Sequence, residues 1–344
     1  MQLDTLIQRL YGGTRKAARF ETMKGDASSR RYHRVVLEPG AVPARLVVME
    51  LPADALKSDE ATAGGPPQEL PFLNVHRHLA AAGIRVPEVY LDAVGDGAVL
   101  LEDLGDETFA QRIAAAGEGG MAAWYEAAVD LLAALHAAMW PIPGGCEAAH
   151  RAFDVALLRW ELDHYREWGA EALRGPLEPA IRGRLDAAFD ALAAEIALLP
   201  RGFVHRDYQS RNLMVTGDQP SPDSLVVIDF QDALAGPRVY DVVALLNDSY
   251  VDVPFELQRR VIARYAEARG LPPEELEREF DLVTVQRKLK DGGRFVFIDR
   301  VKGNPSFLPF VEVSFGRVRA ALARLPGHAE LKAALAEADP ITFG

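Results

Sequence analysis

The chain has 344 residues, and 38 Lys and Arg against 50 Asp and Glu give it a formal net charge of −12. Hydrophobic residues make up 49% and charged residues 26%, which excludes a disordered or fibrous chain and predicts a globular protein of about two lobes. The acidic balance argues against a nucleic-acid partner, because such a partner calls for a basic face.

The composition also indicates a cellular setting. The single cysteine, Cys146, leaves no internal disulfide to form, and the first residues lack a charged segment followed by a long apolar one. No apolar stretch approaches the ~20 residues that cross a bilayer. We therefore predict a cytoplasmic protein without a membrane partner, and we take it to be a monomer.

The first hundred residues predict a small antiparallel sheet with few helices. A helix is expected over 2–11 and another over 71–82, and the strands are expected at 18–24, 30–37, 45–51, 88–93 and 98–102. Small and polar residues form a tight loop between the first two strands. Residues 52–71 are rich in Pro, Gly, Ala and acids, which predicts a mobile loop.

From Asp106 onward, stretches rich in Ala and Leu predict a mostly helical lobe. The helices are expected over 120–139, 155–172, 180–198, 239–250, 256–268, 273–289 and 305–337. Residues 203–230 interrupt this pattern with a polar loop and two short strands, 213–215 and 225–228, that we expect to pair as a hairpin. The predicted division is therefore 1–104 for the sheet-bearing lobe and 105–344 for the helical lobe.

The strongest chemical signal is the segment from His205 to Asn212, which fits the pattern H-R-D-x-x-x-x-N and is followed seventeen residues later by Asp229. Phosphoryl transfer from ATP needs a carboxylate that accepts the proton of the attacking hydroxyl, and oxygen ligands for Mg²⁺. The predicted hairpin would bring Asp207 and Asn212 of the loop close to Asp229. This spacing favours a kinase site over three unrelated turn residues.

With this motif the chain resembles the aminoglycoside phosphotransferase/choline kinase group. The group has a protein-kinase-like bilobal fold of class α+β, with a small β-rich lobe and a larger helical lobe. The segments 25–32, 100–105 and 229–233, with Gly236-Pro237 and Tyr240-Asp241, are most similar to its branch of anomeric N-acetylmuramate/N-acetylglucosamine kinases. The resemblance implies an ATP- and Mg²⁺-dependent kinase that phosphorylates the C1 hydroxyl of one of these amino sugars in cell-wall recycling.

The same resemblance implies a role for each matched residue. Asp207 would be the catalytic base, Asn212 and Asp229 would bind Mg²⁺, and His205 and Asp241 would support the loop. The residues assigned to ATP belong to the first lobe and are Ser28, Ser29, Arg31, Glu102 and Leu104. The candidate contacts of the acceptor are Arg211 and Asp232.

One departure from the group's pattern concerns the charge that pairs with the ATP phosphates. Met49 stands at the strand position where the group usually carries a lysine, so Lys24, Arg30 or Arg31 would supply that charge, or ATP is bound differently. The missing lysine leaves open a non-catalytic nucleotide-binding regulator. An aminoglycoside, choline or another amino alcohol also stays open as the acceptor.

The stretch over 286–302 carries six basic residues against two acidic ones in an otherwise acidic chain. Two interpretations are open. The stretch either meets the lactyl carboxylate of N-acetylmuramate or forms a solvated helix end.

Overall fold

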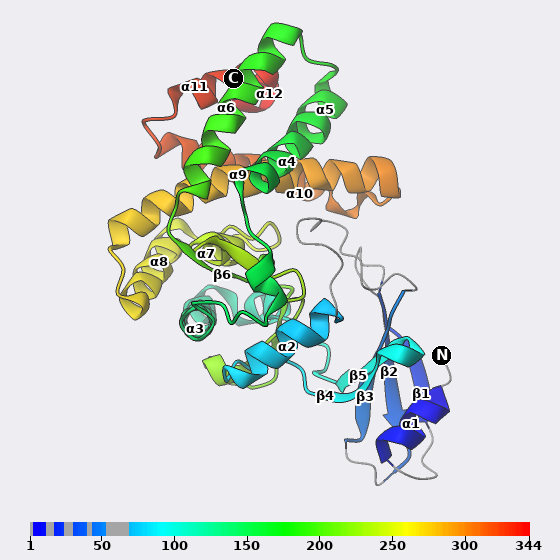
Figure 1. Cartoon of the computed structure of the whole chain (residues 1–344). Coiled ribbons are helices and arrows are strands. Elements are labelled where there is room, and N and C mark those ends of the chain that lie inside the picture. The colour runs from blue at the N-terminus through cyan, green and yellow to red at the C-terminus, as the bar shows by residue number, and fades with distance from the viewer. Residues whose placement is uncertain (1–2, 12–16, 24–29, 40–42, 53–68) are drawn as a thin grey trace.

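The computed structural model describes residues 3–11, 17–23, 30–39, 43–52 and 69–344. It has a small sheet-bearing lobe beside a larger helical one, and the predicted α+β class is confirmed (Figure 1). Most of the predicted loop over 52–71 and the predicted ATP contacts Ser28 and Ser29 lie outside the described residues. The boundary between Leu104 and Gly105 stays a prediction.

The sheet has five strands in the order β1-β2-β3-β5-β4, and all neighbouring pairs are antiparallel. Its strands are β1 (Ala17–Thr22), β2 (Arg31–Leu37), β3 (Arg45–Glu50), β4 (Val89–Ala93) and β5 (Ala98–Glu102). The two helices of this region are α1 (Leu3–Tyr11) and α2 (Pro71–Ala81).

The two faces of the sheet pack against different partners, because side chains alternate along each strand. Leu46 and Val48 of β3 form a small core with Ile7 of α1. Val47 and Met49 point the other way and join the main core, which runs through α2 into the helical lobe. Met49 is thus a fully buried apolar side chain on the face toward the helical lobe.

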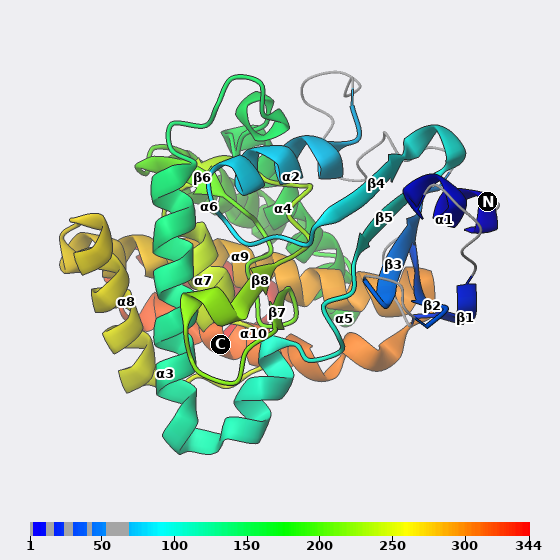
Figure 2. The ribbon, with the colours of Figure 1, turned by 90° about the horizontal axis from the view of Figure 1, so that it is seen from below.

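The helical lobe contains ten α-helices and four short strands within the described residues. The helices are α3 (Phe109–Ala138), α4 (Val155–His164), α5 (Ala172–Arg174), α6 (Pro179–Ala197), α7 (Tyr240–Leu246), α8 (Phe255–Arg269), α9 (Pro273–Lys302), α10 (Pro309–Ala323), α11 (Ala329–Ala338) and α12 (Pro340–Phe343). A π-helical segment, Tyr165–Glu171, continues α4. The strands are β6 (Arg201–Val204), β7 (Leu213–Val215), β8 (Leu225–Val227) and β9 (Leu234–Pro237). Figure 2 shows α3 and α8 side by side at the edge farthest from the sheet.

None of the helices in the described part of the chain combines the length and apolarity that a bilayer crossing requires.

Several local predictions can be compared with these elements. The hairpin is confirmed, with β7 and β8 antiparallel and Met214 opposite Val226. The pairing of β6 with β9 was not expected, because Leu-Ala-Gly-Pro carries no strand pattern. The single helix expected over 305–337 is wrong, since the chain forms α10 and α11 with Pro326 and Gly327 between them.

Helix α9 runs to Lys302, past the predicted end at 289. Gly292 and Gly293 interrupt the side-chain pattern there, yet they lie inside the helix. A Cβ at Gly293 would lie 2.7 Å from the carbonyl oxygen of His164, so α9 approaches the π-helical segment at backbone distance. On the next side of the helix, Gly292 faces the ring of Phe315 in α10. Both glycines are therefore needed for packing rather than for ending the helix.

The segment after β5 connects the sheet to the hairpin. Arg34 of β2 donates to Asp103 at 2.9 Å and to Asp106 at 2.8 Å, which holds this segment against the sheet. Farther along, the backbone N–H of Val215 donates to the carbonyl of Glu107 at 2.9 Å. Arg34 therefore holds the sheet against the segment that leads into the helical lobe, and Glu107 joins that segment to the hairpin.

We expect Gly293→Ala to destabilise the fold by about 1–3 kcal/mol of unfolding free energy, because the new methyl group overpacks α9 against the π-helical segment. Urea denaturation measures this. The matched control is Gly183→Ala in α6, where an added Cβ meets no atom within 4 Å. Alanine there should stabilise by up to about 1 kcal/mol. Equal effects of the two substitutions would contradict the packing described for α9.

Candidate functional site

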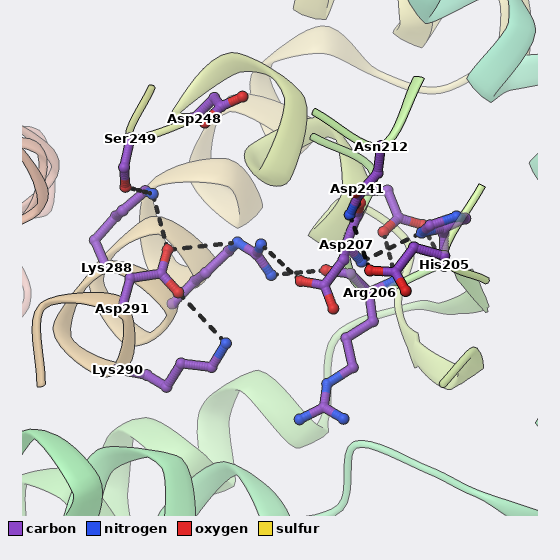
Figure 3. A network of polar contacts seen from close by, with 12 residues as sticks. His205, Arg206, Asp207, Asn212, Asp241, Asp248, Ser249, Lys288, Lys290 and Asp291 are labelled. Carbon is purple, nitrogen blue, oxygen red and sulfur yellow. Dashed lines mark hydrogen bonds and ion pairs between the residues drawn. The ribbon is translucent and has the colours of Figure 1, made fainter. Parts of the chain in front are cut away.

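The loop between β6 and β7 is held by one buried carboxylate, Asp241, in the first turn of α7 (Figure 3). The backbone N–H of His205 donates to its Oδ2 at 2.7 Å, and that of Arg206 donates to its Oδ1 at 2.9 Å. His136 of α3 also donates to Oδ2, at 3.0 Å. Asp241 therefore fixes two consecutive peptide units at the start of the loop.

Arg206 turns the chain through a left-handed backbone conformation, with φ of 81°. This region is costly for a residue with a long side chain, so its surroundings must hold it there. The guanidinium of Arg206 pairs with buried Glu161 at 3.0 Å, and its carbonyl accepts a hydrogen bond from Arg287 at 2.8 Å. These contacts stabilise the turn that presents the next residue, Asp207.

Asp207 presents an ionised carboxylate that is still open to solvent over 35% of its side chain. Its Oδ1 lies 3.4 Å from the Nη2 of Arg287. Burial acts to raise the pKa of Asp207, but the positive charges of Arg287 and Lys290 outweigh it and leave the pKa below its ordinary value. The carboxylate can therefore accept a hydrogen bond from an approaching hydroxyl.

Both ring nitrogens of His205 have protein partners. Its Nε2 donates to the carbonyl of Ile228 at 3.0 Å, and its Nδ1 accepts from the N–H of Asp207 at 3.3 Å. One partner is an acceptor and the other a donor, which matches the Nε2–H tautomer. His205 thus joins the loop to the end of β8 rather than facing solvent.

The structure brings Asp207, Asn212 and Asp229 together, as the spacing predicted. The side-chain amide of Asn212 donates to the Asp207 carbonyl at 2.9 Å and to Asp229 Oδ2 at 3.2 Å. Gln231 donates to the other carboxylate oxygen of Asp229 at 2.7 Å. Gln231, two residues after Asp229, therefore helps to orient its carboxylate.

The electrostatics of Asp229 are opposite to those of Asp207. The residue is exposed to solvent at the end of the hairpin. Burial and the negative charge of Asp207 raise the pKa of Asp229, and the hydrogen bond from Gln231 offsets only part of this. Two like charges therefore lie close together without a cation between them among the described side chains, and a metal ion would relieve their repulsion.

The oxygen atoms of Asp229 and Asn212 suit Mg²⁺ better than a metal whose ligands all come from the protein. Among the described residues, no three His, Cys, Asp or Glu side chains gather closely enough to hold a metal. Magnesium is usually bound by one or two carboxylates together with substrate phosphates. Asp229, with the amide oxygen of Asn212, matches that requirement.

The described residues assigned to ATP lie at the start of β2 and after β5. Arg31 is exposed at the beginning of β2. Burial raises the pKa of its neighbour Tyr32, and the charges of Arg30 and Asp229 also act on that group. The start of β2 is therefore close enough to Asp229 to interact with it electrostatically.

In the segment after β5, the carboxylate of Glu102 is already used within the protein. It accepts from Arg85 Nη1 at 2.8 Å and from the N–H of Glu88 at 3.0 Å. The N–H of Glu102 also donates to the carbonyl of Glu88, at 2.9 Å, so the side chain and the N–H of Glu102 are both used within the protein. The side chain of the neighbouring Asp103 is buried against Arg34.

The two candidate acceptor contacts both have protein partners. The guanidinium of Arg211 stacks 3.6 Å above the ring centre of Tyr250. Asp232 lies 3.9 Å from the guanidinium of Arg151, which is itself buried. Their role toward an acceptor stays a prediction.

Sequence analysis left two interpretations open for the basic stretch over 286–302 and assigned no role to its individual residues. Lys288 donates to Ser249 and to Asp291, both at 2.9 Å, and Lys290 lies 3.4 Å from Asp291. Arg287 and Lys288 are each only 2% exposed. The solvated-helix-end interpretation is therefore wrong for this part of 286–302. The excess of basic residues was the one signal in the sequence.

Comparison with known proteins agrees with this geometry. Residues 19–280 match the phosphotransferase enzyme family. An N-acetylmuramate/N-acetylglucosamine kinase of Pseudomonas aeruginosa is 37% identical, over 97% of this chain and 94% of that protein. One of Pseudomonas putida is 32% identical, over 98% and 93%. Among solved structures, a choline kinase of Cryptosporidium parvum has a TM-score of 0.56 at 13% identity, over 91% of this chain and 92% of that one. This last match shows the kinase-like fold.

Asp241→Asn is expected to destabilise the protein by about 3 kcal/mol, because an amide offers one acceptor oxygen and leaves a buried loop N–H without a partner. Chemical denaturation measures the change. Asp252→Asn serves as the control: that carboxylate is 94% exposed in a surface ion pair and should give no resolvable effect. If the Asp241 variant were as stable as wild type, the loop would not depend on this carboxylate.

Proposed function

The chain belongs to the phosphotransferase enzyme family, and we propose that it is an ATP-dependent kinase that phosphorylates the C1 hydroxyl of N-acetylmuramate or N-acetylglucosamine. The observation that carries this proposal is the convergence of Asp207, Asn212 and Asp229 at one site. Relatives that match nearly the whole chain and are named for these two sugars support the choice of acceptor. The partners are thus a small sugar and ATP, and we place the enzyme in the cytoplasm as a monomer.

In this proposal Asp207 orients the sugar hydroxyl and accepts its proton. The hydroxyl oxygen attacks the γ-phosphorus, the bond from that phosphorus to the bridging oxygen breaks, and ADP leaves. Because Arg287 and Lys290 hold the pKa of Asp207 low, its carboxylate is ionised before the substrate arrives. Its main contribution is then positioning of the nucleophile, with the proton passing late in the reaction.

Mg²⁺ would be held by Asp229 and by the amide oxygen of Asn212. Bound there with the nucleotide, the ion supplies neutralisation of the charge that builds on the phosphates. The raised pKa of Asp229 supports this role, since its carboxylate and Asp207 repel each other until a cation is present.

The nucleotide itself would lie between the sheet and the loop. The backbone of Glu102 and Leu104 would meet adenine, and Ser28, Ser29 and Arg31 would reach the phosphates. Met49 is fully buried and apolar, so the charge of the usual lysine must come from elsewhere. Arg30 is the stronger candidate, because both it and Asp229 act electrostatically on Tyr32.

The charges beside Asp207 disfavour the alternative acceptors. Aminoglycosides and choline are cations, and their binding calls for an anionic wall. The adjoining part of α9 instead places Arg287, Lys288 and Lys290 around the single acid Asp291. A neutral or anionic sugar suits this surface better.

A panel of acceptors tests the proposal. Purified protein with Mg²⁺-ATP should form ADP when N-acetylmuramate or N-acetylglucosamine is added, and ³¹P NMR should show a sugar 1-phosphate. The methyl glycosides are the matched control, because they lack the C1 hydroxyl and should give no product. Turnover with kanamycin or choline instead would refute the sugar assignment. Thermal stabilisation by ATP without turnover of any acceptor would favour the non-catalytic regulator.

Two isosteric substitutions separate the proposed roles. Asp207→Asn should lower kcat by roughly 10²- to 10⁴-fold and leave nucleotide affinity nearly unchanged, because it removes the base alone. Asp229→Asn should weaken the binding of Mg²⁺-ATP, measured by calorimetry with and without the metal. Asp252→Asn again serves as a surface control. Near-normal turnover in the first variant, or near-normal metal-dependent affinity in the second, would contradict the respective role.

A further inference from the structure

One face of α9 runs from the proposed base toward the far side of the site. Three charged residues follow Arg287 by three, four and seven positions: Lys290, Asp291 and Arg294. Residues at these spacings lie on the same side of a helix. The intervening Gly292 and Gly293 face α10 and the π-helical segment. The charged face thus points away from the two close contacts that these glycines make.

Lys290 has fewer hydrogen-bond and ion-pair partners than its basic neighbours Arg287 and Lys288. Arg287 binds the Arg206 carbonyl and Asp207, and Lys288 binds Ser249 and Asp291 at 2.9 Å. The ammonium of Lys290 has a single contact within the described part of the chain, a 3.4 Å approach to Asp291 Oδ1.

That single contact leaves the Lys290 ammonium with binding capacity. An ammonium carries three donors, and charge-assisted hydrogen bonds to carboxylates are normally shorter than 3.0 Å. The side chain is only 15% exposed, so bulk water satisfies the remaining donors poorly. The acid in contact with it, Asp291, is already shared with Lys288 at 2.9 Å, and Glu161 acts on the ammonium only from farther away. Lys290 is therefore equipped to bind a further anionic group.

The position of Lys290 relative to Asp207 indicates which anion this is. Figure 3 shows Asn212 on one side of Asp207, with Lys290 and Asp291 on the other. An in-line displacement puts the nucleotide and the acceptor on opposite sides of the transferred phosphoryl group. Since Asn212 belongs to the proposed nucleotide side, Lys290 belongs to the acceptor side.

The spacing suits a sugar. Lys290 follows Arg287 by three residues, about 4.5 Å along the helix axis, and Arg287 contacts Asp207. The charge of Lys290 is also close enough to act on the pKa of Asp207. With the C1 hydroxyl at Asp207, a substituent on the far side of a pyranose ring would come within reach of the lysine side chain. N-acetylmuramate carries such a substituent, a lactyl ether with a carboxylate, and N-acetylglucosamine does not.

We infer that Lys290 is a specificity-determining residue that binds the lactyl carboxylate of N-acetylmuramate. This inference rests on the function proposed above. Asp291 holds the ammonium in place and leaves its other donors for the substrate. The neutral sugar is accepted without this contact, so the lysine favours the acidic sugar without being needed for turnover.

The kinetic test uses Lys290→Met, which keeps the length of the side chain and removes its charge. The ratio of kcat/KM for N-acetylmuramate to that for N-acetylglucosamine should fall about 10- to 100-fold, through KM of the acidic sugar. Any loss for N-acetylglucosamine should be smaller and should reflect only the missing positive charge beside Asp207. Lys290→Arg should keep most of the preference, and Lys302→Met, at the exposed end of the same helix, should keep all of it.

A second measurement needs only the wild-type protein. The methyl ester of N-acetylmuramate has the same shape without the charge, and it should lose about as much kcat/KM as the acidic sugar loses in Lys290→Met. The variant itself should treat acid and ester alike. This comparison decides the inference even if the methionine variant does not fold.

The outcomes separate the two proposals. An unchanged ratio in Lys290→Met, an equal loss for both sugars, or equal use of acid and ester by the wild type would overturn the role of Lys290. A wild-type protein that phosphorylates neither sugar would instead overturn the proposed function.

Discussion

The site depends on one buried interaction, the carboxylate of Asp241 accepting hydrogen bonds from two consecutive peptide N–H groups. Those bonds stabilise the left-handed turn at Arg206, which an isolated peptide with this side chain would rarely adopt. The turn presents Asp207. The backbone carbonyl of Asp207 accepts a hydrogen bond from the side-chain amide of Asn212. The buried carboxylate of Asp241 thus positions Asp207 and Asn212, which we propose to contact the substrates.

The electrostatic arrangement divides the site into two sides. On one side, Arg287 and Lys290 lower the pKa of Asp207, and on the other its negative charge raises the pKa of Asp229. The first side has surplus positive charge and the second has surplus negative charge. An anionic sugar and a magnesium-bound nucleotide would each meet the charge of the opposite sign, which is why both proposals follow from a single geometry.

Sequence analysis succeeded where the signal was local. The hairpin of β7 and β8 and the strands of the sheet follow from short apolar runs between turn residues. The polar loop between helices made Asp207 and Asn212 candidates for the site. Helix α9 was cut short because two glycines usually weaken a helix. In this helix the two glycines let the backbone of the π-helical segment and the ring of Phe315 pack closely against α9. The packing outweighs the low helix propensity of glycine. Lys290 belongs to the basic stretch over 286–302 that the sequence connected with the lactyl carboxylate, but only the structure distinguishes it from the buried Arg287 and Lys288.

By itself the sequence determined the fold class and the kind of chemistry, because strand alternation, helix periodicity and the spacing from His205 to Asp229 are written in neighbouring residues. Only the tertiary structure decided which distant groups act on those residues. Asp241, His136 and Arg287 come from α7, α3 and α9, and their effect on the loop arises from burial and from charges brought within a few ångströms. Electrostatic coupling depends on distance in space and on exclusion of water, and no one-dimensional pattern records either.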